Sequence, residues 1–342
     1  MKGGKKLAKK ISSLIFAPFD FISHWRSLPA YEMISYIFMY ASVPMLAYGI
    51  KTYDFSIITI IIFSIFALYS GFFAALIWND ITDVDIDDIA HPDRPIPSGR
   101  ITQRKFFGIA LIFSATTFIF SYLVNFWCFM LVGAAALFVT FHNLYLKRKV
   151  KIPAYSEIFT PLQWIIVAVF GYLAIWTALP QSAEFIINMP IFENISTSIY
   201  EFQNMILLIV FIYFTDNAHD LAEGICDAEG DRKSGVRTYA TSFGEKNAAR
   251  ISFAMFFLSG ILGVILFIRT ILTLVFLIPF ILIWLYTFYQ SYKLLKAKVS
   301  DMKKLGAVVG RKGFNYFLIT FDLIFLDIFI QIILTQSKIT LI

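Results

Sequence analysis

The chain has 342 residues, of which 58% are hydrophobic and 15% are charged, and its formal net charge at pH 7 is +6. Soluble domains carry roughly 25% charged and 45–50% apolar residues, so this composition excludes an ordinary soluble domain and indicates an integral membrane protein. The positive charge does not indicate a nucleic-acid partner, because the basic residues are distributed as membrane topology requires. The two cysteines, Cys128 and Cys226, form no disulfide framework or metal-binding pattern.

The first 28 residues form a separate basic segment. They begin with MKGGKKLAKK, and the short apolar stretch that follows has no clear small-residue cleavage site, so a cleaved signal peptide is not expected. Two interpretations stay open: an amphipathic segment on the cytoplasmic membrane surface, or a disordered basic tail. Residues 1–28 are therefore assigned to an N-terminal segment and residues 29–342 to a membrane domain.

The rest of the chain is a series of apolar runs, most of them about 20 residues long, the length of a membrane-spanning helix. Long runs without alternation exclude a barrel, so we expect an all-α polytopic bundle. The narrowest separation between runs, at Asn125, divides the third from the fourth. The nine expected spans cover approximately residues 29–50, 55–79, 106–123, 126–145, 155–179, 200–222, 251–268, 271–291 and 314–335.

The basic residues predict the orientation of these spans. Successive connections alternate sides of the membrane, and 26 of the 29 Lys and Arg residues fall on one side. The other side holds Lys51, Arg269 and Lys338. The positive-inside rule places the crowded side in the cytoplasm, so we expect a cytoplasmic N-terminus and a C-terminus outside.

A first acidic stretch, NDITDVDIDD at residues 79–88, directly follows the second span and holds five aspartates. If the helix continues, a rotation of about 100° per residue gathers four polar residues within one arc. Asp85 and Asp88 are then bystanders, and the helix must end before the proline at position 92. The four residues on the shared face are Asn79, Asp80, Asp83 and Asp87.

A second acidic stretch, DNAHDLAEGICDAEGD at residues 216–231, follows the sixth span. If it is helical, five acids share one narrow face, whereas Glu229 faces away. Gly224 and Gly230 predict a break within this helix. The five acids are Asp216, Asp220, Glu223, Asp227 and Asp231.

Acidic residues beyond a helix end are often simply solvated. Here, however, acids recur on one face at spacings of three or four, in two stretches that are both expected on the cytoplasmic side. Like charges at such spacing destabilise a helix and require a counter-charge. Ionisable faces at a membrane boundary are functional by default, so we interpret the two stretches as halves of one site.

The expected counter-charge is Mg²⁺. The stretches lack paired cysteines, and each has only one histidine in or close to it, His91 just after the first and His219 within the second, so a common zinc site is not expected. Oxygen ligands suit Mg²⁺, which typically shares its coordination with substrate phosphates.

Basic residues in the connections expected on the cytoplasmic side are candidates to bind phosphate oxygens. The positive-inside rule explains most of them without any ligand, so we expect only two or three to do so. The candidates are Arg94, Lys147, Arg148, Arg232 and Lys233.

A membrane bundle with Mg²⁺–diphosphate sites at its cytoplasmic face predicts a lipid diphosphate substrate. Metal ions and cationic side chains would stabilise the departing diphosphate while the allylic carbon becomes a carbocation. Aromatic faces can shield such a cation. The 38 Phe and 17 Tyr residues supply many candidates, but individual aromatic residues cannot be assigned from sequence.

These motifs resemble those of the UbiA-type membrane prenyltransferases. NDITDVDID fits the NDxxDxxxD signature of that family, and DRPIPSGRIT resembles the stretch that follows it. DAEGDRKSGVRT resembles the family's second motif, DxxxD, and nine helices with motifs after the second and sixth match its architecture. The resemblance spans nearly the whole chain.

The resemblance implies Mg²⁺-dependent transfer of a prenyl group from a polyprenyl diphosphate to a hydrophobic acceptor within the membrane. It implies that Asp87 completes the first metal site or helps to activate the acceptor. Lys147, in YLKR, matches a diphosphate-binding lysine of the family, and Arg26 is a further match before the first span. The metal ligands that it implies are Asn79, Asp83, Asp227 and Asp231.

The sequence departs from the family pattern near the second motif. Relatives often have an acid where this chain has Gly224, with Glu223 beside it, and a polar turn of Asp216, His219 and Asp220 lies upstream. These differences bear on the metal ligands and the acceptor more than on the reaction class. The RPIPSGR stretch is most similar to the corresponding stretch in the branches of the family that prenylate glycerol-phosphate lipids or make chlorophyll-type pigments.

Two other functions remain as alternatives. A terpene cyclase on the same scaffold would quench the carbocation internally and use no acceptor. A cation transporter would need carboxylates near the bilayer midplane, and only Asp322 and Asp327 lie deep in a span. We expect these two to form polar contacts between helices.

Overall fold

The computed structural model describes residues 29–90, 92–146, 151–179, 185–187 and 195–339. The N-terminal segment, with Arg26, lies outside the described residues, as do His91, Lys147 and Arg148. The predicted all-α fold is confirmed, with one antiparallel pair of three-residue strands in addition, β1 (Phe185–Ile187) and β2 (Ile195–Thr197). The helices are α2 (Ala30–Tyr48), α3 (Phe55–Thr82), α4 (Val84–Ala90), α5 (Gln103–Val124), α6 (Phe126–Phe141), the π-helix η1 (His142–Leu146), α8 (Tyr155–Trp176), α9 (Ile199–Ser234), α10 (Tyr239–Phe243), α11 (Glu245–Arg269), α12 (Leu274–Leu295) and α13 (Val299–Ile339).

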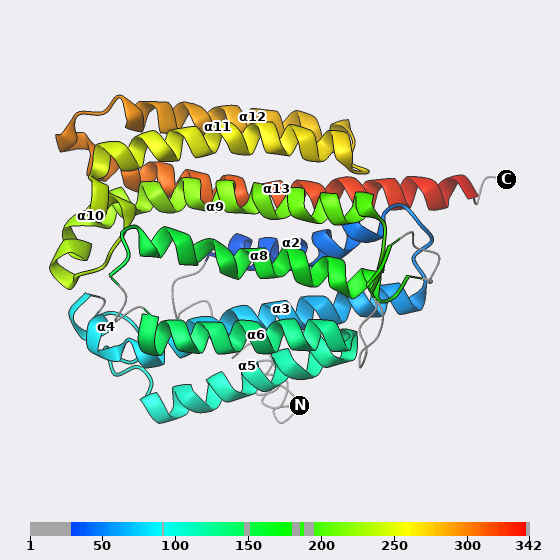
Figure 1. Cartoon of the computed structure of the whole chain (residues 1–342), viewed down its shortest axis with the longest axis horizontal. Helices are drawn as coiled ribbons and strands as arrows, with labels where there is room; N and C mark the ends of the chain where they lie inside the picture. The colour runs from blue at the N-terminus through cyan, green and yellow to red at the C-terminus, as the bar shows by residue number, and fades with distance from the viewer. Residues whose placement is uncertain (1–28, 91, 147–150, 180–184, 188–194, 340–342) are drawn as a thin grey trace, which may run out of the picture.

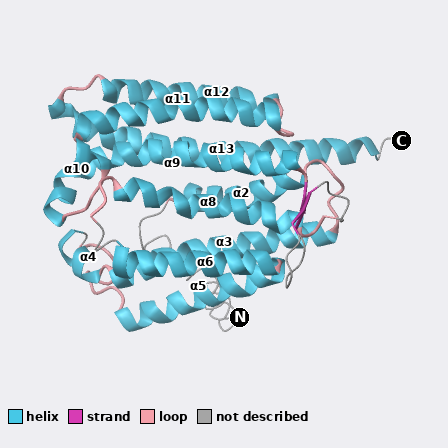
Figure 2. Cartoon of the chain, in the orientation of Figure 1, coloured by secondary structure: helices cyan, strands magenta, loops and turns pink. Residues whose placement is uncertain are grey.

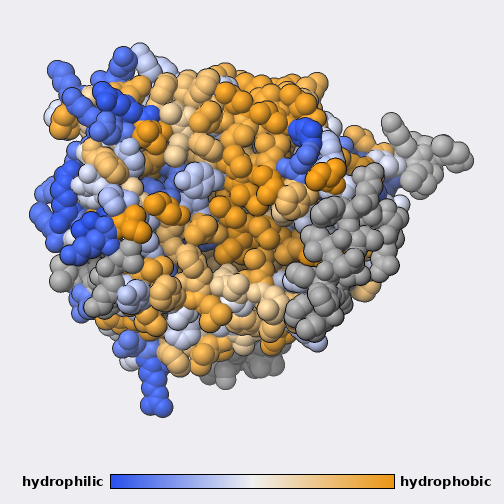
Figure 3. All heavy atoms as spheres, viewed as in Figure 1, coloured by the Kyte–Doolittle hydropathy of each residue, from blue (hydrophilic) through white to orange (hydrophobic). Residues whose placement is uncertain are grey.

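Each of the nine predicted spans coincides with a helix. Among the described residues, eight helices are long and apolar enough to cross a membrane, and the first, α2, is not one of these eight. Figure 3 shows hydrophobic side chains across the middle of the molecule and hydrophilic ones gathered at the end where α4 and α10 lie. Large apolar side chains point outward, such as Leu137, which is 75% exposed, as expected of a lipid-facing surface. The nine-span count and the orientation stay predictions.

The long helices lie side by side in a bundle (Figure 1). One edge is formed by α11 and α12 and the opposite edge by α5 and α6, with the other long helices between them. The strands lie at the end of the bundle away from α4 and α10 (Figure 2). The ends of α3 and α9 that carry the acidic stretches therefore lie at the same end of the molecule.

Side-chain caps fix where several helices begin. The Asp54 carboxylate accepts a hydrogen bond from the Ile57 N–H at 3.0 Å and starts α3. Asn125 separates α5 from α6, as predicted, and its side chain accepts from the Cys128 N–H at 2.8 Å. Ser198 caps α9 in the same way. Each cap satisfies an amide that has no partner within the helix.

The predicted break within the second acidic stretch is wrong. α9 runs for 36 residues through Gly224 and Gly230 and ends only at Gly235, whose φ of 72° is left-handed. Glycine weakens a helix by only about 1 kcal/mol relative to alanine, and packing against neighbouring helices overrides that preference here. The five acids of this stretch therefore occupy one uninterrupted helix.

Glycines allow α13 to approach α9 closely beside these acids. A Cβ atom at Gly310 would lie 2.2 Å from Glu223 Cγ, and one at Gly313 would lie 2.6 Å from His219 Cβ. Small residues at helix contacts are typical of membrane bundles, where close backbone approach stabilises association. α9 and α13 therefore pack closely together along the second acidic stretch.

Candidate active site

The first acidic stretch occupies a bend between two helices. α3 ends at Thr82, and the Asp83 N–H still donates to the Asn79 carbonyl at 2.9 Å before α4 begins. The side chains of Asp80, Asp83 and Asp87 are buried, each residue being 2% exposed, whereas Asp85 and Asp88 are exposed. The helical spacing therefore correctly separated the buried aspartates from the exposed ones. α4 ends at Ala90, before the proline-rich loop, as predicted.

The proline-rich loop after α4 places the positively charged side chain of Arg94 beside this cluster. One Arg94 nitrogen, Nη1, donates to both carboxylate oxygens of Asp87 at 2.6 and 2.7 Å, and it lies 3.6 Å from Asp80 Oδ1. Such charge-assisted hydrogen bonds are short and strong. Arg94 thus neutralises part of the first cluster in this structure, and its predicted contact with diphosphate stays a prediction.

The second acidic stretch divides into two levels along α9. The deeper level contains Asp216 and His219, which are buried, and Asp220, which is half-buried. Nearer the end of the helix, Asp227 is exposed and Asp231 is half-buried. No Lys or Arg of the described residues forms an ion pair with Asp227 or Asp231. These two carboxylates remain accessible to an external cation.

Two of the other predicted phosphate-binding residues, Arg232 and Lys233, are described, and both form ion pairs with glutamates. Arg232 donates to Glu245 on α11 at 2.6 Å, and Lys233 pairs with Glu229 at 3.2 Å on the exposed side of α9. Lys147, Arg148 and Arg26 lie outside the described residues. Their predicted roles are neither supported nor opposed by these contacts.

Sequence reasoning missed Glu157, in the first turn of α8. Its side chain is buried, and its Oε1 atom accepts a hydrogen bond from the Tyr239 N–H at 2.7 Å. A Cβ atom at Gly224 would lie 3.5 Å from the same oxygen, so the glycine leaves room for this carboxylate. Glu157 also lies close enough to Asp231 for their charges to interact. A lone acid inside the apolar run 155–179 was the available signal.

A π-helix, η1, ends directly before Lys147 in the sequence. In η1, His142 Nδ1 lies 2.6 Å from the Tyr155 hydroxyl, and the two rings stack. π-Helical turns occur frequently at functional sites. This contact joins η1 to the first turn of α8.

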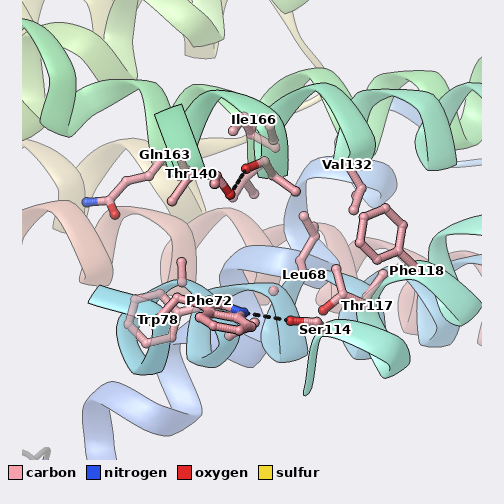
Figure 4. Close-up of a pocket in the computed structure, with 18 of the residues that line it drawn as sticks. Leu68, Phe72, Trp78, Ser114, Thr117, Phe118, Val132, Thr140, Gln163 and Ile166 are labelled. Carbon is pink, nitrogen blue, oxygen red and sulfur yellow. Dashed lines mark hydrogen bonds between the residues drawn. The ribbon is translucent and has the colours of Figure 1, made fainter. Parts of the chain in front are cut away.

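An apolar pocket of about 370 Å³ lies beside the first acidic stretch. It is enclosed by α3 and α5 on one side and α6 and α8 on the other (Figure 4). Its lining extends from Thr82, the residue before Asp83, to Phe118 and Val132. Trp78 is held at the pocket wall because its Nε1–H donates to Ser114 Oγ at 3.0 Å. The pocket can hold a flexible hydrocarbon whose polar end faces the acids.

The donor atoms suit a hard divalent cation. The residues at the ends of α3 and α9 offer carboxylate and amide oxygens, which are the ligands that Mg²⁺ prefers. Uncompensated carboxylates such as Asp227 and Asp231 gain most from such an ion, because no described Lys or Arg pairs with them. The residues present therefore fit Mg²⁺ bound together with an anionic substrate.

Comparison with known proteins agrees with this fold. Residues 35–307 match the UbiA prenyltransferase family. Two similar sequences are the digeranylgeranylglyceryl phosphate synthases of Methanococcoides burtonii, 26% identical over 72% of this chain and 74% of the relative, and of Sulfolobus acidocaldarius, 26% identical over 55% of this chain. The matched region spans only 57% of the length of the Sulfolobus relative.

Solved structures show the same fold. A UbiA homolog from Aeropyrum pernix K1 is 17% identical, with a TM-score of 0.58 over 85% of this chain and 99% of that one. A UbiA homolog from Archaeoglobus fulgidus, bound to GPP and Mg²⁺, is 14% identical, with a TM-score of 0.52 over 87% and 99% of the two chains.

Proposed function

The chain belongs to the UbiA prenyltransferase family, and from this premise we propose that it transfers a prenyl group from a polyprenyl diphosphate to a lipophilic acceptor in a Mg²⁺-dependent reaction. The observation that carries the proposal is the location of both acidic stretches at one end of the bundle, with an apolar pocket beside the first. The positive-inside bias puts this end at the cytoplasmic face of the membrane.

The acceptor that we propose is of the glycerol-phosphate type. Two similar sequences are named digeranylgeranylglyceryl phosphate synthase, although their identity to this chain is only 26%. The RPIPSGR stretch after the first motif points to the same branch. An aromatic acceptor is the other possibility within this reaction class, and product analysis distinguishes the two.

In the proposed reaction, Asn79 and Asp83 hold metal at the end of α3, and Asp227 and Asp231 hold it on α9. Bound Mg²⁺ would neutralise the diphosphate and thereby favour its departure from the allylic carbon. Asp80 of α3 and Asp87 of α4 lie on either side of the bend at Asp83, and both approach the same Arg94 nitrogen, so the bend brings their carboxylates to one region. The straight course of α9 keeps Asp227 and Asp231 one turn apart on one face.

Arg94 acts in this scheme by orienting Asp87. Its hydrogen bonds to both Asp87 oxygens fix the direction of the carboxylate. Asp87 held in this way would accept a proton from an acceptor hydroxyl or complete the first metal site. Lys147, Arg148, Arg232 and Arg26 remain proposed partners of the phosphate oxygens.

The apolar pocket is the proposed site for the prenyl chain. Its aromatic residues at the acidic end, Phe72, Trp78 and Trp164, would present ring faces to a cation formed at the allylic carbon. Phe118 and Val132 lie far from that end and would limit the length of chain that the pocket accepts.

Product analysis tests this function. Purified protein in nanodiscs is given prenyl diphosphates of increasing length, from DMAPP and GPP upward, with glycerol-phosphate lipids, with aromatic acceptors or with no acceptor. We expect a prenylated glycerol-phosphate lipid by mass spectrometry. A cyclic hydrocarbon or alcohol formed without acceptor would instead establish the terpene cyclase alternative.

The transport alternative finds no support in the two deep aspartates. Asp327 accepts hydrogen bonds from the Thr273 N–H and hydroxyl at 2.6 and 2.7 Å, which joins α13 to the start of α12. Asp322 accepts from the Ser35 hydroxyl at 2.8 Å and joins α13 to α2. Both form the contacts between helices that the sequence predicted.

A further inference from the structure

A second cluster of ligand-type side chains lies deeper on α9 than the second motif. It consists of Asp216, His219, Asp220 and Glu223, and His219 precedes Asp227 by eight residues, or about 12 Å along the helix. The proposed prenyl transfer uses none of these four residues. These four ligand-type side chains therefore form a distinct group to which the proposed reaction assigns no role.

Asp216 orients the histidine ring. Asp216 Oδ1 lies 3.1 Å from His219 Nε2, and the two residues are 0% and 4% exposed. Spacing of three residues places both side chains on one face of α9. In metal sites, a ligating histidine usually gives its other ring nitrogen to a carboxylate, which sets the tautomer and the ring direction. Asp216 holds His219 in that relationship.

The second ring nitrogen of His219 lies beside the Asp220 carboxylate. Nδ1 is buried, makes no hydrogen bond with any described residue and lies 3.4 Å from Asp220 Oδ1. One ligand atom each from His219, Asp220 and Glu223 lies within 4.8 Å of the others, a spacing that one metal ion can bridge. Glu223 is exposed, so the cluster has an open side.

The neighbouring helix, α13, packs against the cluster but does not neutralise its negative charge. Gly310 and Gly313 of α13 press against Glu223 and His219, and the Phe314 ring lies 5.2 Å from the His219 ring. Within the described ranges, no Lys or Arg pairs with Asp216, Asp220 or Glu223. A bound cation would therefore stabilise the three carboxylates of this cluster.

We propose that His219, Asp220 and Glu223 form a metal site separate from the Mg²⁺ sites, with Asp216 orienting the histidine. One imidazole nitrogen and two carboxylate oxygens suit Zn²⁺, Mn²⁺ or Co²⁺ better than Mg²⁺, which prefers oxygen ligands alone. Three protein ligands and an open side leave a coordination position for water or another small ligand.

Pulsed EPR of bound Mn²⁺ tests the site in the full-length protein in nanodiscs. Only a histidine ligand gives the Mn²⁺ spectrum a nitrogen modulation of imidazole type, so this readout separates the new site from the all-oxygen sites. We expect the modulation in the wild type and in an Asp83→Asn/Asp227→Asn double variant, whose Mg²⁺ sites are disabled. The result is therefore independent of prenyl transfer.

His219→Gln should abolish the nitrogen modulation, and His91→Gln, at the other acidic stretch, should leave it intact. Glu223→Gln removes an exposed ligand with little risk to folding and should weaken the affinity of the nitrogen-coupled Mn²⁺ at least about tenfold. Asp216→Asn should weaken it by about 10–100-fold and retain the modulation at saturation.

Two results would overturn the proposal. The first is a nitrogen modulation that persists in His219→Gln. The second is its absence from the wild type at saturating Mn²⁺, which would mean that His219 is an imidazolium paired with Asp216 and Asp220.

Discussion

The two acidic motifs at the end of the bundle differ in what neutralises them. In the first, at the bend between α3 and α4, Arg94 of the following loop forms a hydrogen-bonded ion pair with Asp87. In the second, on the straight helix α9, Asp227 and Asp231 have no such partner among the described Lys and Arg residues. One motif thus contains its own counter-charge, and we expect the other, which has none among the described residues, to depend on a bound cation. This difference predicts unequal responses to changes in charge.

Removal of the divalent cation should have the largest effect, because the second motif then has no counter-charge. We expect diphosphate release from a prenyl diphosphate to fall to the background rate in excess EDTA. Mg²⁺ should restore it, and Na⁺ at equal ionic strength should not. Release that continues in EDTA would show that cationic side chains alone neutralise the diphosphate.

Arg94→Ala makes the first motif resemble the second. Loss of its hydrogen bonds leaves Asp87 without its orienting partner, and we expect turnover to fall by up to about 100-fold. The cluster also becomes more negative, so half-maximal activity should require less Mg²⁺. A Mg²⁺ titration of turnover measures both effects. An increased Mg²⁺ requirement would contradict the assignment of Arg94 as the internal counter-charge.

Gly313→Ala tests the packing that keeps the second motif on a straight helix. The added methyl group would meet His219 and Phe256, so we expect a loss of about 1–3 kcal/mol in the free energy of unfolding. Gly230→Ala is the matched control, because no atom lies within 4 Å of its Cβ position. It should stabilise the protein by about 0.5–1 kcal/mol. Equal thermal stability of the two variants in detergent would argue against this contact.

Glu157→Gln should have the smallest effect. The amide oxygen can still accept from the Tyr239 N–H, so the free energy of unfolding should change by less than about 0.5 kcal/mol. Removal of a negative charge near Asp231 should raise the Mg²⁺ concentration for half-maximal activity a few-fold. Glu157→Ala leaves the buried amide unpaired and should cost about 1–3 kcal/mol in unfolding experiments. An unchanged Mg²⁺ requirement in Glu157→Gln would separate this residue from the second motif.

Much of the fold could be predicted from the sequence because lipid restricts the chain to helices. Run length located each long helix among the described residues, and helical spacing separated Asp83 and Asp87 from Asp85 and Asp88. The same reasoning failed at Gly224 and Gly230, where local helix preference is weak and the contacts of α9 with other helices decide the outcome.

Contacts between distant segments could not be predicted. Glu157 meets α9 and the Tyr239 amide across more than 60 residues of sequence, and no local pattern signals that pairing. Arg94 was identified as a candidate cation, but its partner depends on how the proline-rich loop folds back. The His219 cluster was visible in the sequence as an unusual polar turn. Only the structure shows which ring nitrogen of His219 forms a hydrogen bond with Asp216.

The most direct test of the central claim is Mg²⁺-dependent diphosphate release by Asp83→Asn and Asp227→Asn, with Asp85→Asn as the control. Each of the first two removes one carboxylate from one motif, and we expect each to lower release by about 100-fold or more with the thermal stability retained. Asp85→Asn should release diphosphate at the wild-type rate, because Asp85 is exposed and outside the shared face. Wild-type release by both Asp83→Asn and Asp227→Asn would contradict the conclusion that the two motifs form one metal-dependent site.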